Sequence, residues 1–160
     1  MEEMSLEQGL EEIGLVLTRN ELYMKMRFMD VALSAFYYVQ DFSVDLLATD
    51  GETMYFNGQM LGGEYRQNRI EVNRAYLHLV LHCIFRHVFR RNGREELVWN
   101  LAADIAVESV IDDWNLQNIR KSQSWIRQRT YRDLKEEIKV FTAEKIYGVL
   151  VRWKLSDREM

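Results

Sequence analysis

The stretch His78-Leu-Val-Leu-His82-Cys-Ile-Phe-Arg-His87 contains all three histidines of the 160-residue chain. It lies within residues 70–91, the longest run with the apolar spacing of a helix, and Asn92-Gly93 can end that helix in a left-handed C-cap. On such a helix His78 and His82 are about 40° apart in rotation and about 6 Å apart in rise. Both imidazoles then project from one face, so they can ligate a single metal ion.

The neighbours of this pair are predicted to lie outside the metal site. His87 is about 140° around the helix axis from His82 and about 180° from His78, so an unbroken helix turns it away. Cys83 points about 100° away from His82 and is interpreted as a buried structural thiol. The spacing alone leaves open that His78 and His82 are ordinary residues of a half-buried helix face.

The next predicted helix, residues 97–114, offers a third ligand. Asp104 lies in the apolar stretch 101–107, where a carboxylate without a partner would be costly. A zinc site needs a third protein ligand, and Asp104 would serve. A salt bridge from Asp104 to Arg86 or Arg90 is the competing interpretation.

The rest of the chain indicates an α+β fold in which helix dominates, organised as one domain over residues 1–160. Residues 4–39 are predicted to be helical, with a break near residues 18–20 where Asn20 caps a second segment. Two short strands, 44–49 and 53–56, are joined by Asp50-Gly51, and Gly62-Gly63 is predicted to be a loop. Further helices are expected at residues 123–139 and from Thr142 onward, with Thr142 as N-cap.

Composition excludes several classes of protein. The net charge of −4 argues against a protein devoted to nucleic acid, and the basic stretch 120–139 also carries acidic residues, as a solvated helix face does. No apolar run approaches the roughly 18 residues of a membrane span. One cysteine and an acidic N-terminus indicate neither disulfides nor a signal peptide, so a cytoplasmic location is expected.

Three blocks resemble a known family. They are Ala48-Thr-Asp-Gly-Glu-Thr-Met-Tyr-Phe-Asn57, then Leu77-His-Leu-Val-Leu-His82 with His87 and Arg90-Arg91, then Trp99-Asn-Leu-Ala-Ala-Asp104. In this order they resemble the bacterial putative metallopeptidase domain that usually precedes a von Willebrand factor A-like domain. The blocks span residue 48 to about residue 111.

The resemblance implies a zincin-like fold with a small β-sheet packed beside the HxxxH helix. It places His78 and His82 as Zn²⁺ ligands and Asp104 as the carboxylate that completes the site. It also implies that the strand in residues 48–57 binds a peptide by β-addition, and that a von Willebrand factor A-like domain is a partner.

One departure from the family pattern bears on activity. The family has HExxH, with glutamate after the first histidine, whereas this chain has Leu79. That glutamate takes the proton from zinc-bound water, and leucine cannot, so no catalytic residue is assigned. Glu108, one turn beyond Asp104, is a weak candidate for a substitute base.

Three hypotheses therefore stand after the sequence. The first is a zinc-binding pseudoenzyme, a metallopeptidase-like domain with a degenerate HExxH motif and a binding or regulatory role. The second is an active metallohydrolase of unusual mechanism, and the third is a metal-free protein-interaction module.

Overall fold

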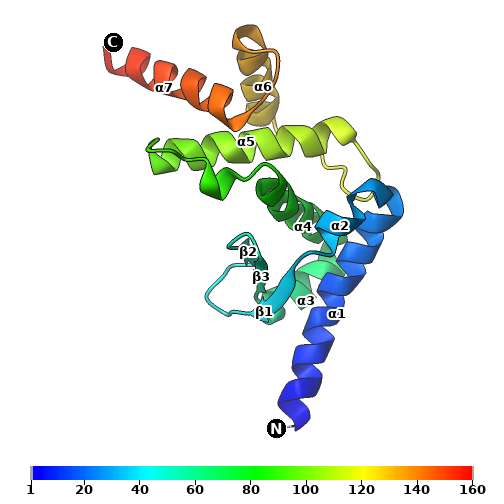
Figure 1. Cartoon of the computed structure of the whole chain (residues 1–160). Helices are drawn as coiled ribbons and strands as arrows, with labels where there is room; N and C mark the ends of the chain where they lie inside the picture. The colour runs from blue at the N-terminus through cyan, green and yellow to red at the C-terminus, as the bar shows by residue number, and fades with distance from the viewer. Residues whose placement is uncertain (1, 160) are drawn as a thin grey trace.

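Helices dominate the computed structural model, which describes residues 2–159 and the side chains of residues 12–158. The elements, in chain order, are α1 (Glu2–Lys25), the 3₁₀ turn η1 (Arg27–Met29), α2 (Asp30–Leu33), β1 (Tyr37–Gln40), β2 (Leu47–Thr49), β3 (Thr53–Phe56), α3 (Gly58–Gln67), α4 (Arg69–Ile84), the 3₁₀ turn η2 (His87–Phe89), α5 (Glu96–Trp114), α6 (Trp125–Glu137) and α7 (Ala143–Glu159). A small three-stranded sheet accompanies them, so the α+β class is confirmed (Figure 1). None of the described helices combines the length and apolar character that a membrane crossing requires.

The sheet has the strand order β1-β3-β2. Strands β2 and β3 form the expected antiparallel hairpin, with Ala48 opposite Tyr55, and Gly51 in their turn has a φ of +106° that suits glycine. Strand β1 was not expected, because residues 37–39 were assigned to the end of a helix. It pairs parallel to β3 instead, so β2 lies at an edge of the sheet.

The first helix also differs from the prediction. It continues through residues 18–20, because the Thr18 hydroxyl donates to the carbonyl of Gly14 at 2.9 Å and Asn20 lies inside the helix rather than at a cap. The break comes at Met26. On both sides of this break the segment contributes to the core, since Leu22, Met26 and Leu33 are all fully buried.

The segment after the sheet is helical where a loop was predicted. Asn57 caps α3 by accepting the N–H of Met60, and the helix continues through Gly62-Gly63 to Gln67. The later helices lie close to their expected bounds, and Thr142 accepts the N–H of Lys145 as the cap of α7.

Helix α5 contributes to two buried apolar clusters. Val107 and Ile111 belong to a cluster built with α1, α2, β3, α3 and α4. Trp99 and Ala103 belong to a second cluster with α6 and α7. Figure 1 shows α5 crossing the molecule between these two groups of elements. The surface on which α4 packs against α5 therefore lies between the clusters, and it is here that the polar side chains gather.

Tyr76 connects α4 to the segment before the sheet. Its side chain is fully buried, and its hydroxyl donates to the carbonyl of Leu33 at 2.7 Å and lies 2.8 Å from the hydroxyl of Tyr38. We expect Tyr76→Phe to lower the free energy of unfolding by about 1–3 kcal/mol, because the Leu33 carbonyl stays buried without its donor. Urea denaturation measures this loss.

The matched control is Tyr37→Phe, which removes the same hydroxyl from a ring that is 77% exposed. This variant should change the stability by less than about 0.5 kcal/mol. Equal effects of the two substitutions would contradict a structural role for the Tyr76 hydroxyl.

Candidate metal centre

The helix that carries the histidines ends earlier than predicted. Helix α4 stops at Ile84 rather than at residue 91, and Arg86 adopts a left-handed conformation with φ 57°. This reversal turns the chain back, so that Nδ1 of His87 lies 2.9 Å from Nδ1 of His82. The prediction that His87 points away was therefore wrong, because it assumed an unbroken helix.

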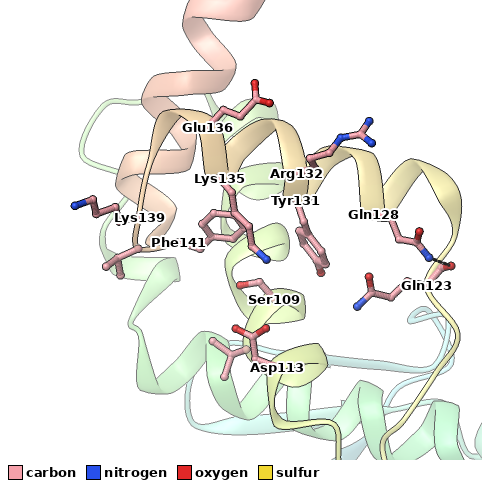
Figure 2. Close-up of a pocket in the computed structure, with 12 residues that line it drawn as sticks. Ser109, Asp113, Gln123, Gln128, Tyr131, Arg132, Lys135, Glu136, Lys139 and Phe141 are labelled. Atoms are coloured by element: carbon pink, nitrogen blue, oxygen red, sulfur yellow. Dashed lines mark hydrogen bonds between the residues drawn. The ribbon is translucent and has the colours of Figure 1, made fainter.

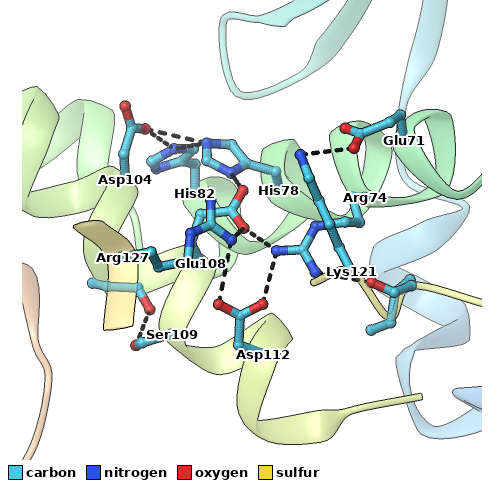
Figure 3. Close-up of polar contacts among 12 residues, drawn as sticks. Glu71, Arg74, His78, His82, Asp104, Glu108, Ser109, Asp112, Lys121 and Arg127 are labelled. Atoms are coloured by element: carbon cyan, nitrogen blue, oxygen red, sulfur yellow. Dashed lines mark hydrogen bonds and ion pairs between the residues drawn. The ribbon is translucent and has the colours of Figure 1, made fainter. Parts of the chain in front are cut away.

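His78, His82 and Asp104 converge as predicted. Nε2 of His78 and Nε2 of His82 are 2.8 Å apart, and Oδ1 of Asp104 lies 3.1 Å from the first and 2.9 Å from the second (Figure 3). Among the described residues Asp104 pairs with these histidines and not with Arg86 or Arg90. One atom from each side chain is thus presented to a common point, where the three could hold a metal ion.

The separations fit zinc. Zn²⁺ with bonds of roughly 2.0–2.1 Å in tetrahedral geometry needs ligand atoms about 3.3 Å apart, a few tenths of an ångström more than the distances found. The side chain of Asp104 is also 55% exposed, which leaves one side of the cluster open. The apolar neighbours of Asp104 in the sequence suggested a buried carboxylate, whereas the structure places it largely in solvent.

Each histidine is held through its other ring nitrogen. Nδ1 of His78 lies 2.9 Å from Oε1 of Glu108, while Nδ1 of His82 faces His87. A histidine that ligates a metal through Nε2 must carry its proton on Nδ1 and donate it to an acceptor, and both acceptors are present. Burial, reinforced by the charge of His82, lowers the pKa of His87 to about 4, so His87 is neutral near pH 7 and can accept.

Glu108 is fixed on both of its oxygens. Oε1 faces His78, while Oε2 accepts from Arg74 and lies 3.4 Å from Arg127. Burial alone would raise the pKa of Glu108, but the hydrogen bond from His78 and the charge of Arg74 lower it to about 2. Glu108 is therefore an anion whose oxygens are engaged, which suits an orienting residue better than a mobile base.

Arg74 and Asp112 were missed by sequence reasoning. The two side chains are 5% and 4% exposed and pair at 3.0 Å, and Asp112 also accepts from the hydroxyl of Tyr131 at 2.9 Å. Asp112 lies within α5, one turn beyond Glu108. The available signal was spacing, because positions 74, 78 and 82 on α4 and 104, 108 and 112 on α5 recur at one helical turn.

A proton competes with a metal ion for this site. Burial alone would lower the pKa of His78, but hydrogen bonds to Asp104 and Glu108 raise it to about 9 in the metal-free protein. Burial alone would raise the pKa of the Asp104 carboxyl, but the hydrogen bonds to the two histidines outweigh burial and lower it. Metal binding must displace the His78 proton, so affinity is expected to rise with pH up to about 9.

Leu79 lines the two depressions on either side of the histidines. One, of about 500 Å³, includes Thr49, His82 and Asp104, and the other, of about 320 Å³, includes Leu47 and His78. The half-buried side chain of Leu79 therefore lies beside both histidines.

The free edge of β2 faces the same depressions. The backbone N–H of Asn57 donates to the carbonyl of Leu46 at 3.0 Å, so these two residues form a hydrogen-bonded pair between the strands. Hydrogen-bonded and non-hydrogen-bonded pairs alternate along an antiparallel ladder. The backbone groups of Leu47 and Thr49 consequently point away from β3, at the free edge of the sheet, and both residues line the depressions that contain the histidines.

Another pocket lies elsewhere, between α5 and α6 (Figure 2). It has a volume of about 760 Å³ and is lined by residues such as Tyr131, Lys135 and Phe141. The hydroxyl of Ser109, a candidate nucleophile in this pocket, already donates to the carbonyl of Ala106 at 2.7 Å. The lining of the pocket includes no histidine. Hydrolytic chemistry is therefore better supported at the histidine cluster than in this pocket.

Cys83 stays outside the cluster. Its half-buried Sγ lies 4.0 Å from the hydroxyl of Thr49, and burial raises the pKa of the thiol. This placement agrees with the direction expected from the helix geometry, away from His82.

Comparison with known proteins gives one finding. A family model described as putative metallopeptidase domain matches residues 17–159. No curated protein and no solved structure gives a significant match to the chain. The matched range contains His78, His82, Asp104 and the residues that hold them.

The contact between His87 and the candidate ligand His82 can be tested by substitution. We expect His87→Phe to weaken Zn²⁺ binding about 10–100-fold, because the ring is preserved but the acceptor for His82 is lost. His87→Gln, which keeps an acceptor, should retain more of the affinity. Competition with a chromophoric chelator measures both, and circular dichroism confirms that each variant is folded. Wild-type affinity in the Phe variant would show that His87 only fills space.

Proposed function

The chain belongs to the family described as putative metallopeptidase domain, and from this premise we propose that it is a zincin-like domain that binds Zn²⁺ and peptides but hydrolyses peptides poorly. The observation that carries the proposal is the convergence of His78, His82 and Asp104, with Nδ1 of each histidine held by its own acceptor. Two imidazoles and one carboxylate with an open side are a common ligand set for catalytic zinc.

The residues of the chain divide the work at such a site. His78, His82 and Asp104 would hold the ion, which supplies a Lewis acid and acidifies bound water. Glu108 and His87 orient the two imidazoles, and the charge of Glu108 is balanced by Arg74 and Arg127. Metal binding is thus supported by side chains from α4, α5, α6 and η2.

None of the described residues at the site is well placed to transfer a proton. Leu79 has no group that accepts a proton, and Asp104 is committed to the histidines. Glu108 has both oxygens engaged, so it is a poor substitute. General-base catalysis contributes typically about 10²–10⁴-fold, and we infer that activity is reduced on this scale. A binding or regulatory role fits a site of this kind.

Peptide binding is supported by the edge of β2. Leu47 and Thr49 lie at the free edge of the sheet and line the depressions that contain the histidines, so an extended peptide could add to the sheet and cross the metal site. A von Willebrand factor A-like domain, the usual neighbour of the family that the sequence resembles, is the protein partner that we propose.

The missing base can be restored. We expect Leu79→Glu to raise zinc-dependent cleavage of a fluorogenic peptide library about 10²–10⁴-fold, because a carboxylate then lies beside the two histidines. Addition of a chelator should abolish the gain. Leu79→Gln is the matched control, since it has the same size and polarity but cannot accept the proton, and it should give no gain.

Two outcomes would contradict the proposal. A wild-type protein as active as Leu79→Glu would favour the active hydrolase of unusual mechanism. A Leu79→Glu variant that contains zinc but shows no gain would mean that the site is not arranged for peptide hydrolysis.

A further inference from the structure

A separate apolar pocket adjoins the histidine cluster, by which we mean His78, His82 and Asp104 together with Glu108, which holds His78. It lies between α5, α6 and α7, has a volume of about 540 Å³, and includes Asp104 and Glu108 in its lining. Its apolar walls are formed by Leu101, Ile105, Ile126, Leu150 and Trp153. Of these, Leu101 and Ile126 are 52% and 58% exposed, which is high for large apolar side chains.

Most polar groups of this pocket already have partners, and the Ser124 hydroxyl oxygen accepts the N–H of Arg127 at 3.2 Å. The hydroxyl of Thr130 donates to the carbonyl of Ile126 at 2.8 Å, and that of Tyr131 donates to Asp112. Arg127 lies between Glu108 and Asp112, at 3.4 and 3.3 Å from their oxygens. A polar group entering the pocket would lose its hydration with little to replace it, whereas an apolar group would gain by burial.

A basic group is also poorly matched. The carboxylate of Asp104 faces the histidines, and that of Glu108 is balanced by Arg74 and Arg127. An acidic group would meet these same two carboxylates in the lining of the pocket. The lining therefore selects for an uncharged apolar occupant.

We propose that this pocket binds the side chain of a bulky apolar residue, of the leucine or phenylalanine type, in a peptide held at the histidine cluster. The inference rests on the proposed function and names its substrate class. Asp104 borders both sites, and an extended chain advances only about 3.3 Å per residue. The apolar side chain therefore belongs to a residue next to the peptide group that faces His78 and His82.

The test uses the full chain loaded with zinc and five acetylated pentapeptide amides. Each peptide is alanine except at the third position, which is leucine, phenylalanine, serine, lysine or aspartate. Binding is followed by nuclear magnetic resonance of the protein methyl groups. Full burial of a leucine or phenylalanine side chain corresponds to a preference of about tenfold or more over serine. The shifted resonances should be those of Leu101, Ile105, Ile126 and Leu150.

Two double variants separate the pocket from other apolar surface. Leu101→Ser with Ile126→Ser changes two exposed wall residues, so the fold should survive, and the preference should fall below about threefold. Leu97→Ser with Leu155→Ser makes the same change at two exposed leucines of α5 and α7 outside the pocket, and it should keep the wild-type preference.

Several results would overturn the inference. These are equal binding of the five peptides, no binding of any, tightest binding of the lysine peptide, or an equal loss in both double variants. Dimerisation that only the wall variant abolishes would assign the pocket to a second copy of the chain. Zinc content, assayed in parallel, separates the two proposals: zinc-loaded protein without the preference refutes the pocket alone, whereas zinc-free protein that keeps the preference refutes the zinc site alone.

Discussion

The pairing of α4 with α5 through matched polar residues is the interaction on which the rest of the site depends. Arg74, His78 and His82 occupy successive turns of α4 and face Asp112, Glu108 and Asp104 on successive turns of α5. Buried charges are tolerated only when they are paired, and the Arg74–Asp112 pair, 5% and 4% exposed, meets this condition. Because these contacts fix the two helices along their length, they also fix the distance between the histidines and Asp104.

In the function that we propose, metal binding and proton transfer depend on different residues. Holding a metal ion involves the ligands, their acceptors Glu108 and His87, and the arginines that balance Glu108. Proton transfer, by the resemblance described in the sequence analysis, would depend on the residue after the first histidine, which is Leu79 here. On this proposal, one substitution at residue 79 would remove hydrolysis and leave the metal ligands in place. The apolar pocket and the free edge of β2 would serve binding rather than proton transfer.

Sequence reasoning found the parts of the site that follow from local geometry. The spacing of His78 and His82 and the position of Asp104 on the next helix depend only on regular α-helices, and the structure brings all three together. His87 was misplaced because a non-glycine residue, Arg86, takes a positive φ, which helical periodicity does not reveal. Strand β1 was missed because its pairing with β3 is a contact between distant segments. The partners of Asp112 could be seen only once α4 and α5 were placed side by side.

Zinc stoichiometry tests the central claim most directly. Wild-type protein, saturated with Zn²⁺ and then freed of excess ion, should contain about one zinc per chain by elemental analysis, as a single tetrahedral site requires. His82→Ala should contain almost none, because it removes a ligand, while Cys83→Ser, which changes the adjacent residue outside the cluster, should match the wild type. Equal, substoichiometric zinc in wild type and His82→Ala would contradict the metal centre.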